Sequence, residues 1–166
     1  LCLGIYYSSH ELTVAEANIL SDYLEGGGKL YMEGRLTWFA DQQTVLHNMF
    51  NINTEEVSWY EYDSISGFPG TFTEGMNFDY EMTQPYNNYY LTAEEPAFEL
   101  LKSAPSSTAV MVAYDAGDYK TIGSNAEFGG LVDGLDPSTK IELLARILEF
   151  FGDILTGTEE NPSKEI

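Results

Sequence analysis

The chain has 166 residues, with 27 acidic against 7 basic side chains, which gives a formal net charge of −20 at pH 7. This length is sufficient to bury the core of one ordinary domain. Hydrophobic residues make up 43% and aromatic residues 14%, which argues against disorder, because disordered acidic chains lack such side chains. So negative a surface repels phosphate groups, and no apolar run approaches the roughly 18 residues of a membrane span. We therefore expect no nucleic-acid partner and no membrane insertion.

The first fifty residues alternate strand and helix patterns. Residues 1–7 predict a buried strand, and Thr13 with Glu16 has the spacing of a capping box that begins a helix. Three consecutive glycines end this helix, and residues 29–33 predict a second strand. The apolar pattern over 37–50 predicts a second helix. Strands and helices that alternate with short connections predict a parallel α/β sheet.

The middle of the chain breaks this alternation. Residues 51–92 contain ten aromatic residues, and no Lys or Arg occurs between Arg35 and Lys102, where eleven acidic residues lie. Glycine and proline interrupt the span repeatedly. We expect strand-like pieces and long loops here, so that about 51–92 form an aromatic-rich irregular insertion.

The last third returns to regular patterns. Residues 94–103 suggest a short helix. Residues 108–114 and 119–123 predict a β-hairpin, because a Gly-containing turn joins two apolar runs. A final helix is expected over 136–152, with Gly152 at its end.

The expected fold is a three-layer α/β domain, with a mostly parallel sheet flanked by helices and a late β-hairpin. We assign residues 1–152 to this domain and the polar residues 153–166 to a linker or tail. The chain opens inside a predicted strand, which leads us to expect that it is part of a longer protein.

Several segments carry a family resemblance, mainly those at 20–34, 113–121 and 141–152. In this order they resemble the class I glutamine amidotransferase-like fold, a flavodoxin-like α/β fold, and especially its non-catalytic branch in large secreted bacterial proteins. The resemblance covers about 1–50 and 106–152. It implies that the first strand and helix of the family lie upstream of the chain, and it implies an extracellular or cell-surface location.

The catalytic members of this family need a cysteine on the turn after a strand, with a histidine and an acidic partner. Here the turn after the second predicted strand is Gly34-Arg35-Leu36, and no His-x-Glu segment occurs. The resemblance therefore implies a module without amidotransferase chemistry.

The first candidate site is the carboxyl edge of the predicted parallel sheet, where open α/β sheets bind ligands. This edge would carry Ser8, Ser9, His10, Gly34 and Arg35. Arg35 can hold a carboxylate in bidentate geometry. The alternative is structural, with Arg35 paired to an acidic neighbour and His10 simply preceding a helix.

The second candidate is an aromatic surface from the middle span, since aromatic rings stack on sugars and suit protein contacts. Its candidate residues are Trp59, Tyr60, Tyr62, Tyr86, Tyr89 and Tyr90. A glycan or another protein would be the ligand. The alternative is that these rings form the core of the insertion.

The third candidate is a calcium site, because calcium takes oxygen ligands flexibly. Asp115 with Asp118, and Asp133 with Asp136, lie in Gly-containing turns. The alternative is ordinary turn chemistry, in which aspartate accepts hydrogen bonds from its own turn.

Together these patterns predict a non-catalytic binding or structural module of a larger secreted or cell-surface protein. Its partners would be other domains of the same polypeptide or copies of itself, as in an extracellular assembly. The alternative function is a carbohydrate-active hydrolase that uses paired carboxylates of the middle span, such as Glu61 and Glu74.

Overall fold

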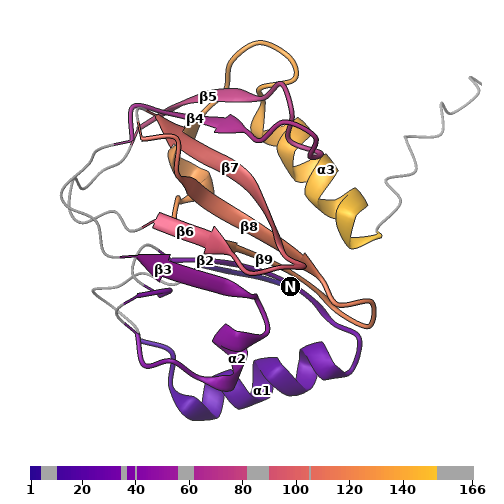
Figure 1. Cartoon of the computed structure of the whole chain (residues 1–166). Coiled ribbons are helices and arrows are strands. Elements are labelled where there is room, and N and C mark those ends of the chain that lie inside the picture. Colours follow the sequence, from indigo (N-terminus) through magenta and orange to yellow (C-terminus); the bar gives the residue numbers. More distant parts are fainter. Residues whose placement is uncertain are drawn as a thin grey trace, which may run out of the picture.

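The computed structural model describes residues 1–4, 11–34, 37–39, 41–55, 62–81, 90–104 and 106–152. Within these ranges the chain forms one mixed sheet, three α-helices and a short 3-10 helix (Figure 1). The strands are β1 (Cys2–Gly4), β2 (Lys29–Glu33), β3 (Ile52–Glu55), β4 (Ser64–Gly67), β5 (Asn77–Tyr80), β6 (Tyr90–Ala93), β7 (Phe98–Ala104), β8 (Ala109–Asp115), β9 (Lys120–Ser124) and β10 (Leu131–Val132). The helices are α1 (Val14–Glu25), α2 (Val45–Asn48) and α3 (Lys140–Phe151), and the 3-10 helix is η1 (Phe128–Gly130). In the described ranges no helix has both the length and the apolar character that a membrane crossing requires.

The strands follow the order β1-β2-β9-β8-β7-β4-β5-β10, with β6 branching from β8 and β3 pairing with β6. The pairs β1–β2 and β2–β9 are parallel. All other pairs between the described strands are antiparallel. The expected mostly parallel, three-layer sandwich is therefore wrong: the chain forms a curled, antiparallel-rich sheet with few helices (Figure 1).

The middle of the chain accounts for this difference. Its described residues form β3, β4, β5 and β6, all of which belong to the sheet, so the expectation of an irregular insertion was wrong. Its aromatic residues contribute to the core, and Phe78 is fully buried. Of these strands, β4 pairs antiparallel with β5, which follows it in the chain, and β3 pairs antiparallel with β6. Antiparallel pairs need no crossover helix, which a parallel pair would require.

The short helix expected over 94–103 is also absent, since β7 occupies most of this range. The buried residues Ala97, Leu100 and Leu101 have the i, i+3, i+4 spacing of a helix. In the structure a β-bulge interrupts the register of β7 against β8 around Leu101, so that two consecutive leucines reach the core from one strand.

Three expected elements are confirmed. The helix α1 begins after Thr13, whose side chain accepts from the Glu16 amide while the Glu16 carboxylate accepts from the Thr13 amide. The strand β2 lies at 29–33, and β8 and β9 form the late hairpin. The last helix is shorter than expected, because Thr139 caps it and it begins at Lys140.

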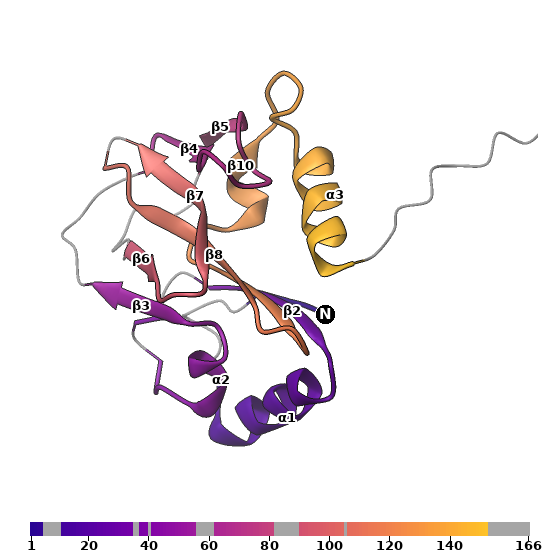
Figure 2. The same cartoon turned by 45° about the vertical axis from the view of Figure 1, so that its right-hand side comes forward.

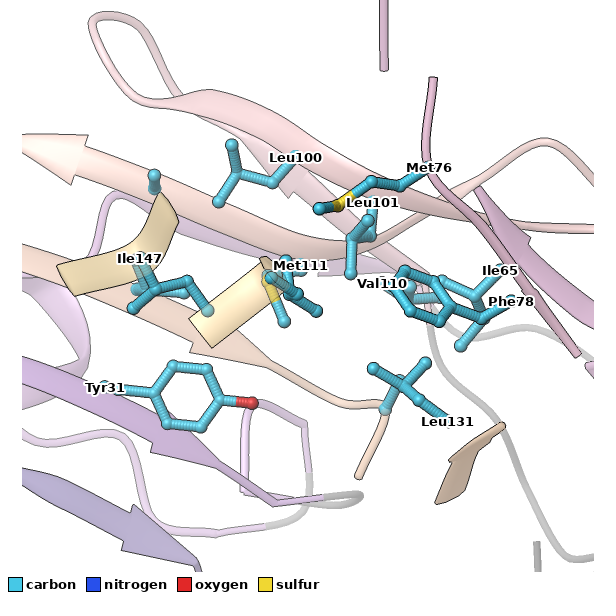
Figure 3. Close-up of a cluster of buried hydrophobic side chains, with 14 of the residues drawn as sticks. Tyr31, Ile65, Met76, Phe78, Leu100, Leu101, Val110, Met111, Leu131 and Ile147 are labelled. Carbon is cyan, nitrogen blue, oxygen red and sulfur yellow. The ribbon is translucent and has the colours of Figure 1, made fainter. Parts of the chain in front are cut away.

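The sheet separates two buried clusters, and its helices lie on opposite sides of it (Figure 2). One cluster packs between the sheet and α3 and includes Tyr31, Met111 and Ile147 (Figure 3). The other packs against α1 and α2 and includes Leu30 and Met32. Neighbouring residues of β2 enter different clusters because side chains alternate across a strand.

Candidate functional site

A pocket of about 700 Å³ opens between β1, β2 and α3, on the α3 side of the sheet. We call it the edge pocket, because β1 is the last strand of the sheet on this side and pairs only with β2 among the described strands. The loop after α1 and the start of η1 complete its walls. The pocket therefore lies where the sheet ends and where α3 stops covering it.

The sequence of β2 supplies one wall of the edge pocket. Lys29, Tyr31 and Glu33 line it, whereas the residues between them are buried against α1. From β1, Cys2 and Gly4 line the pocket beside them, in parallel register with Tyr31 and Glu33. Strand alternation alone thus aligns three polar side chains along one face.

The helix α3 supplies the opposite, apolar wall. Ile147 and Phe151 are buried against the sheet and also reach the pocket. Leu144 is 42% exposed, and Ile141, three residues earlier, is 81% exposed. With Leu148 these residues form a stripe at i, i+3 and i+7, so α3 carries apolar surface beyond the face that packs on the sheet.

The polar group in the edge pocket is the pair formed by Tyr31 and Glu33. The Tyr31 hydroxyl donates to Glu33 Oε2 at 2.7 Å, and the backbone amide of Phe128 donates to the same oxygen at 2.8 Å. Within the described ranges the other oxygen, Oε1, has no hydrogen bond. The pKa of the Tyr31 phenol is held well above its usual value, mainly by burial and to a smaller extent by the negative charge of Glu33. Tyr31 is therefore a neutral donor, and it fixes the orientation of the carboxylate.

The predicted carboxyl edge of the sheet is described only in part. Gly34 is buried, and its amide donates to the Ser124 carbonyl, which ties the end of β2 to β9. Ser8, Ser9, His10 and Arg35 lie outside the described residues.

The helix α2 carries a buried histidine, His47, that was not among the predicted site residues. The Thr44 amide donates to His47 Nδ1 at 3.1 Å, and His47 Nε2 lies 3.1 Å from the Thr37 carbonyl oxygen. These partners suit a neutral ring that donates from Nε2, and burial lowers the pKa of His47. The capping position of His47, three residues after Thr44, is the signal that could have identified it.

Beside this histidine, Asp41 is also buried, and its Oδ2 atom has no hydrogen-bond partner. Burial raises the pKa of the Asp41 carboxyl. The described residues contain no group of three or more His, Cys, Asp and Glu side chains arranged to hold a metal ion. Asp41 and His47 are thus two buried titratable side chains close enough for each charge to affect the pKa of the other.

Of the proposed aromatic surface, two residues are described. Tyr62 is buried and packs on Tyr80, with ring centroids 5.8 Å apart, and Tyr90 is half-buried at the start of β6. Trp59, Tyr60, Tyr86 and Tyr89 lie outside the described residues. For Tyr62 the structure favours a role in the core.

The four aspartates proposed for calcium are all described. Asp115 accepts from Lys120 Nζ at 2.8 Å and from the Gly117 amide at 2.9 Å, and the hydrogen bond from Lys120 lowers the pKa of its carboxyl. Asp133 accepts from the Lys140 amide at the start of α3, while Asp118 and Asp136 are exposed. Asp115 and Asp133 thus stabilise a turn and a helix start.

Of the two carboxylates named for the alternative hydrolase function, the structure describes only Glu74. Glu74 is exposed and accepts from the Gly70 amide at 2.9 Å, in the turn between β4 and β5. Glu61 lies outside the described residues.

The chain is similar in fold to several solved structures. It matches the N-terminal domain of mmIFT52 with a TM-score of 0.57 and 15% identity, over 90% of this chain and 75% of that one. It matches a cytoplasmic protein from Salmonella typhimurium with a TM-score of 0.55 and 14% identity, over 90% and 70%. A beta-galactosidase from Bacillus circulans sp. alkalophilus matches with a TM-score of 0.53 and 13% identity, over 90% of this chain and 21% of that one.

A glutamine amidotransferase from Thermotoga maritima also matches, with a TM-score of 0.45 and 9% identity over 84% of this chain and 53% of that one. No protein-family model matches the chain, and no curated protein matches it. The matches with TM-scores of 0.53 to 0.57 show, at these identities, a shared general fold. The chain corresponds to about a fifth of the beta-galactosidase.

Proposed function

We propose that this chain is a non-catalytic binding module of a larger secreted or cell-surface protein. In this proposal the edge pocket holds an extended polypeptide segment from a neighbouring domain of the same protein, which lies beside β1. The observation that carries the proposal is the pocket itself, about 700 Å³ in volume and bounded by the last strand of the sheet and an apolar stripe of α3.

The strand β1 supports an extended occupant. Its inner edge pairs with β2, while no other described strand lies along its outer edge. Backbone N–H and C=O groups along such an edge can pair with an added strand, and side-chain pockets beside it give specificity. Parallel strands are normally covered on both faces, and the α3 face of β1 and β2 opens into the pocket instead.

The walls of the edge pocket support an apolar occupant. Leu144 and Leu148 of α3 line the pocket together with Leu1, which is 57% exposed, and the exposed Ile141 extends the apolar stripe of α3 beyond the pocket. Contiguous apolar surface of this kind marks binding sites on folded proteins. The volume falls within the roughly 300–1,000 Å³ that ligand pockets occupy.

The polar pair in the pocket supports binding over catalysis. Glu33 already accepts two hydrogen bonds on one oxygen, one from the Tyr31 hydroxyl and one from the Phe128 amide. Such a pair orients a bound group. It does not activate Tyr31 as a nucleophile, because burial and the neighbouring charge keep the pKa of its phenol high.

The single cysteine of the chain allows a direct test. Cys2 is exposed and lines the edge pocket, so its reaction rate with a thiol reagent such as DTNB reports whether the pocket is occupied. We expect Cys2 to react at least about tenfold more slowly in the intact parent protein than in the isolated chain. In the parent, Leu144→Glu should restore fast reaction, because it adds a charge to the apolar wall.

The matched control is Leu135→Glu, since Leu135 is 89% exposed and does not line the pocket. This variant should leave Cys2 protected. Equal reaction rates in the parent and in the isolated chain, with both proteins folded, would rule out a segment bound in the edge pocket.

A further inference from the structure

We infer that the occupant of the edge pocket presents a cationic group, a lysine ammonium or an arginine guanidinium, to Glu33. This inference rests on the proposed function and specifies its ligand chemistry. It follows from the geometry of one carboxylate and from the distribution of basic residues around it.

Glu33 is held with one oxygen available. Its Oε2 accepts from the Tyr31 hydroxyl and the Phe128 amide, at 2.7 and 2.8 Å. Its Oε1 lies on the side of Gly4, where a Cβ atom added to that glycine would be 3.7 Å away. Both Glu33 and Gly4 line the pocket, so an occupant beside β1 passes close to this oxygen. A carboxylate oxygen accepts hydrogen bonds only, and the strongest come from charged donors.

Four of the five lysine and arginine residues in the described ranges have side-chain contacts away from Glu33. Lys120 binds Asp115 and the Phe150 carbonyl, and Arg146 binds Glu142 and the Phe72 carbonyl. Lys140 donates to the Leu131 carbonyl, and Lys102 lies over the ring of Phe68. In the described part of the chain, therefore, no ion pair reaches Glu33. With a net charge of −20, the chain attracts a cation from outside.

Lys29, the basic residue that lines the edge pocket, does not neutralise Glu33. The two residues lie four positions apart on β2, which separates their backbones by about 13 Å. In the described part of the chain no ion pair joins these two side chains. The pocket thus has a basic and an acidic end, with apolar walls between them.

The lining around Glu33 also favours a cation. The rings of Tyr31, Phe128 and Phe151 line the same pocket. Aromatic faces attract ammonium and guanidinium groups, and a pair removed from water is stronger than one on the surface. An apolar segment that carries one basic side chain would satisfy the walls and the carboxylate together.

Three small probes with one carbon skeleton test this inference. We would measure the binding of 4-phenylbutylamine, 4-phenylbutanol and 4-phenylbutyrate to the folded chain by calorimetry and by protection of Cys2. We expect the amine to bind at least about tenfold more tightly than the alcohol, because both can donate a hydrogen bond to Glu33 but only the ammonium adds an attraction between opposite charges. The carboxylate probe should bind most weakly.

Two variants assign the preference to Glu33. In Glu33→Gln the amine and the alcohol should bind with equal affinity, while the affinity for the alcohol stays within about twofold of its original value. Asp79→Asn removes one charge from an exposed site on β5, outside the pocket, and should keep the preference for the amine. Near-UV circular dichroism verifies that each variant is folded.

Each outcome decides one question. If the amine and the alcohol bind the unsubstituted chain with equal affinity, the inference is overturned, and this result does not depend on whether Glu33→Gln folds. The pocket would still be a binding site in that case. A preference that persists in Glu33→Gln also overturns the inference. If none of the probes binds or protects Cys2, the inference falls, and the parent-protein experiment then decides the proposed function separately.

Discussion

Gly123 lies at the centre of the sheet, where β9 approaches two side chains on the α1 side. A Cβ atom built at this position would lie 2.4 Å from Ile52 Cδ1 and 2.7 Å from Trp38 Cη2 and Cζ2. Carbon atoms normally pack at about 3.5–4.0 Å. In Gly123→Ala, the side chains of Ile52 and Trp38 would therefore each have to move by about 1 Å, although both are packed against other residues.

The two neighbours differ in how easily they can move. The Cδ1 atom of Ile52 can rotate away. Trp38 is held on three sides, because its indole N–H donates to the Ser124 carbonyl at 2.9 Å and its ring lies 4.9 Å from Phe50 and 6.0 Å from His47. We expect Gly123→Ala to lower the free energy of unfolding by about 2–3 kcal/mol, in the upper part of the range for overpacked cores. The melting temperature should fall by about 4–12 °C.

Urea unfolding followed by far-UV circular dichroism measures this change. Gly129→Ala is the control, since no heavy atom lies within 4 Å of a Cβ at that position, and it should alter stability by less than about 0.5 kcal/mol. Trp38→Phe removes the two ring carbons that collide, so the double variant should be more stable than the sum of the single effects by about 1 kcal/mol or more. If the free energy of unfolding of Gly123→Ala equals that of the unsubstituted chain, Trp38 does not pack against β9 in the way described.

The remaining predictions concern single elements and use the same unfolding measurement. Burial lowers the pKa of His47, so its contribution to stability is present above about pH 6.5 and is lost as the pH falls; between pH 8 and 5 the unsubstituted chain should lose stability relative to His47→Asn, and parallel profiles would contradict this. Thr13→Ala removes the cap of α1 and should cost about 1 kcal/mol, whereas Thr13→Ser should cost little; equal costs would refute the capping role. Leu24→Ala should cost about 2–5 kcal/mol and Ile19→Ala under about 1 kcal/mol, because Leu24 is fully buried and Ile19 is mostly exposed on the same helix; a reversed order would show that α1 packs by another face.

The sequence predicted correctly those elements that are determined by residues close together in the chain. The capping box at Thr13 and the turn between β8 and β9 depend on residues a few positions apart, and both occur as expected. The direction of strand pairing depends on distant segments, and the sequence contains no comparable signal for it. The sheet is antiparallel-rich in part because β4 pairs antiparallel with both β5 and β7, and no residue spacing within 51–104 indicates this pairing.

The same contrast between neighbouring and distant residues applies to the edge pocket. The alternation of Lys29, Tyr31 and Glu33 could be read from β2 as soon as the strand was assigned. The pocket could not, because it arises where α3, more than a hundred residues later, leaves β1 and β2 uncovered. The expected carboxyl-edge site stays a prediction: the two strands that would carry it, β1 and β2, are parallel, and its residues apart from Gly34 lie outside the described ranges.

The strand β8 contributes side chains to both buried clusters, with Val110 and Met111 on the α3 side and Ala109 and Val112 on the α1 side. It also pairs with β6, β7 and β9. Opening either cluster alone leaves the other packed against this strand. The amide hydrogens of β8 should therefore exchange with solvent only when the whole domain unfolds, and their exchange rates would report the global stability of the chain while those of β1 report local opening at the edge of the sheet.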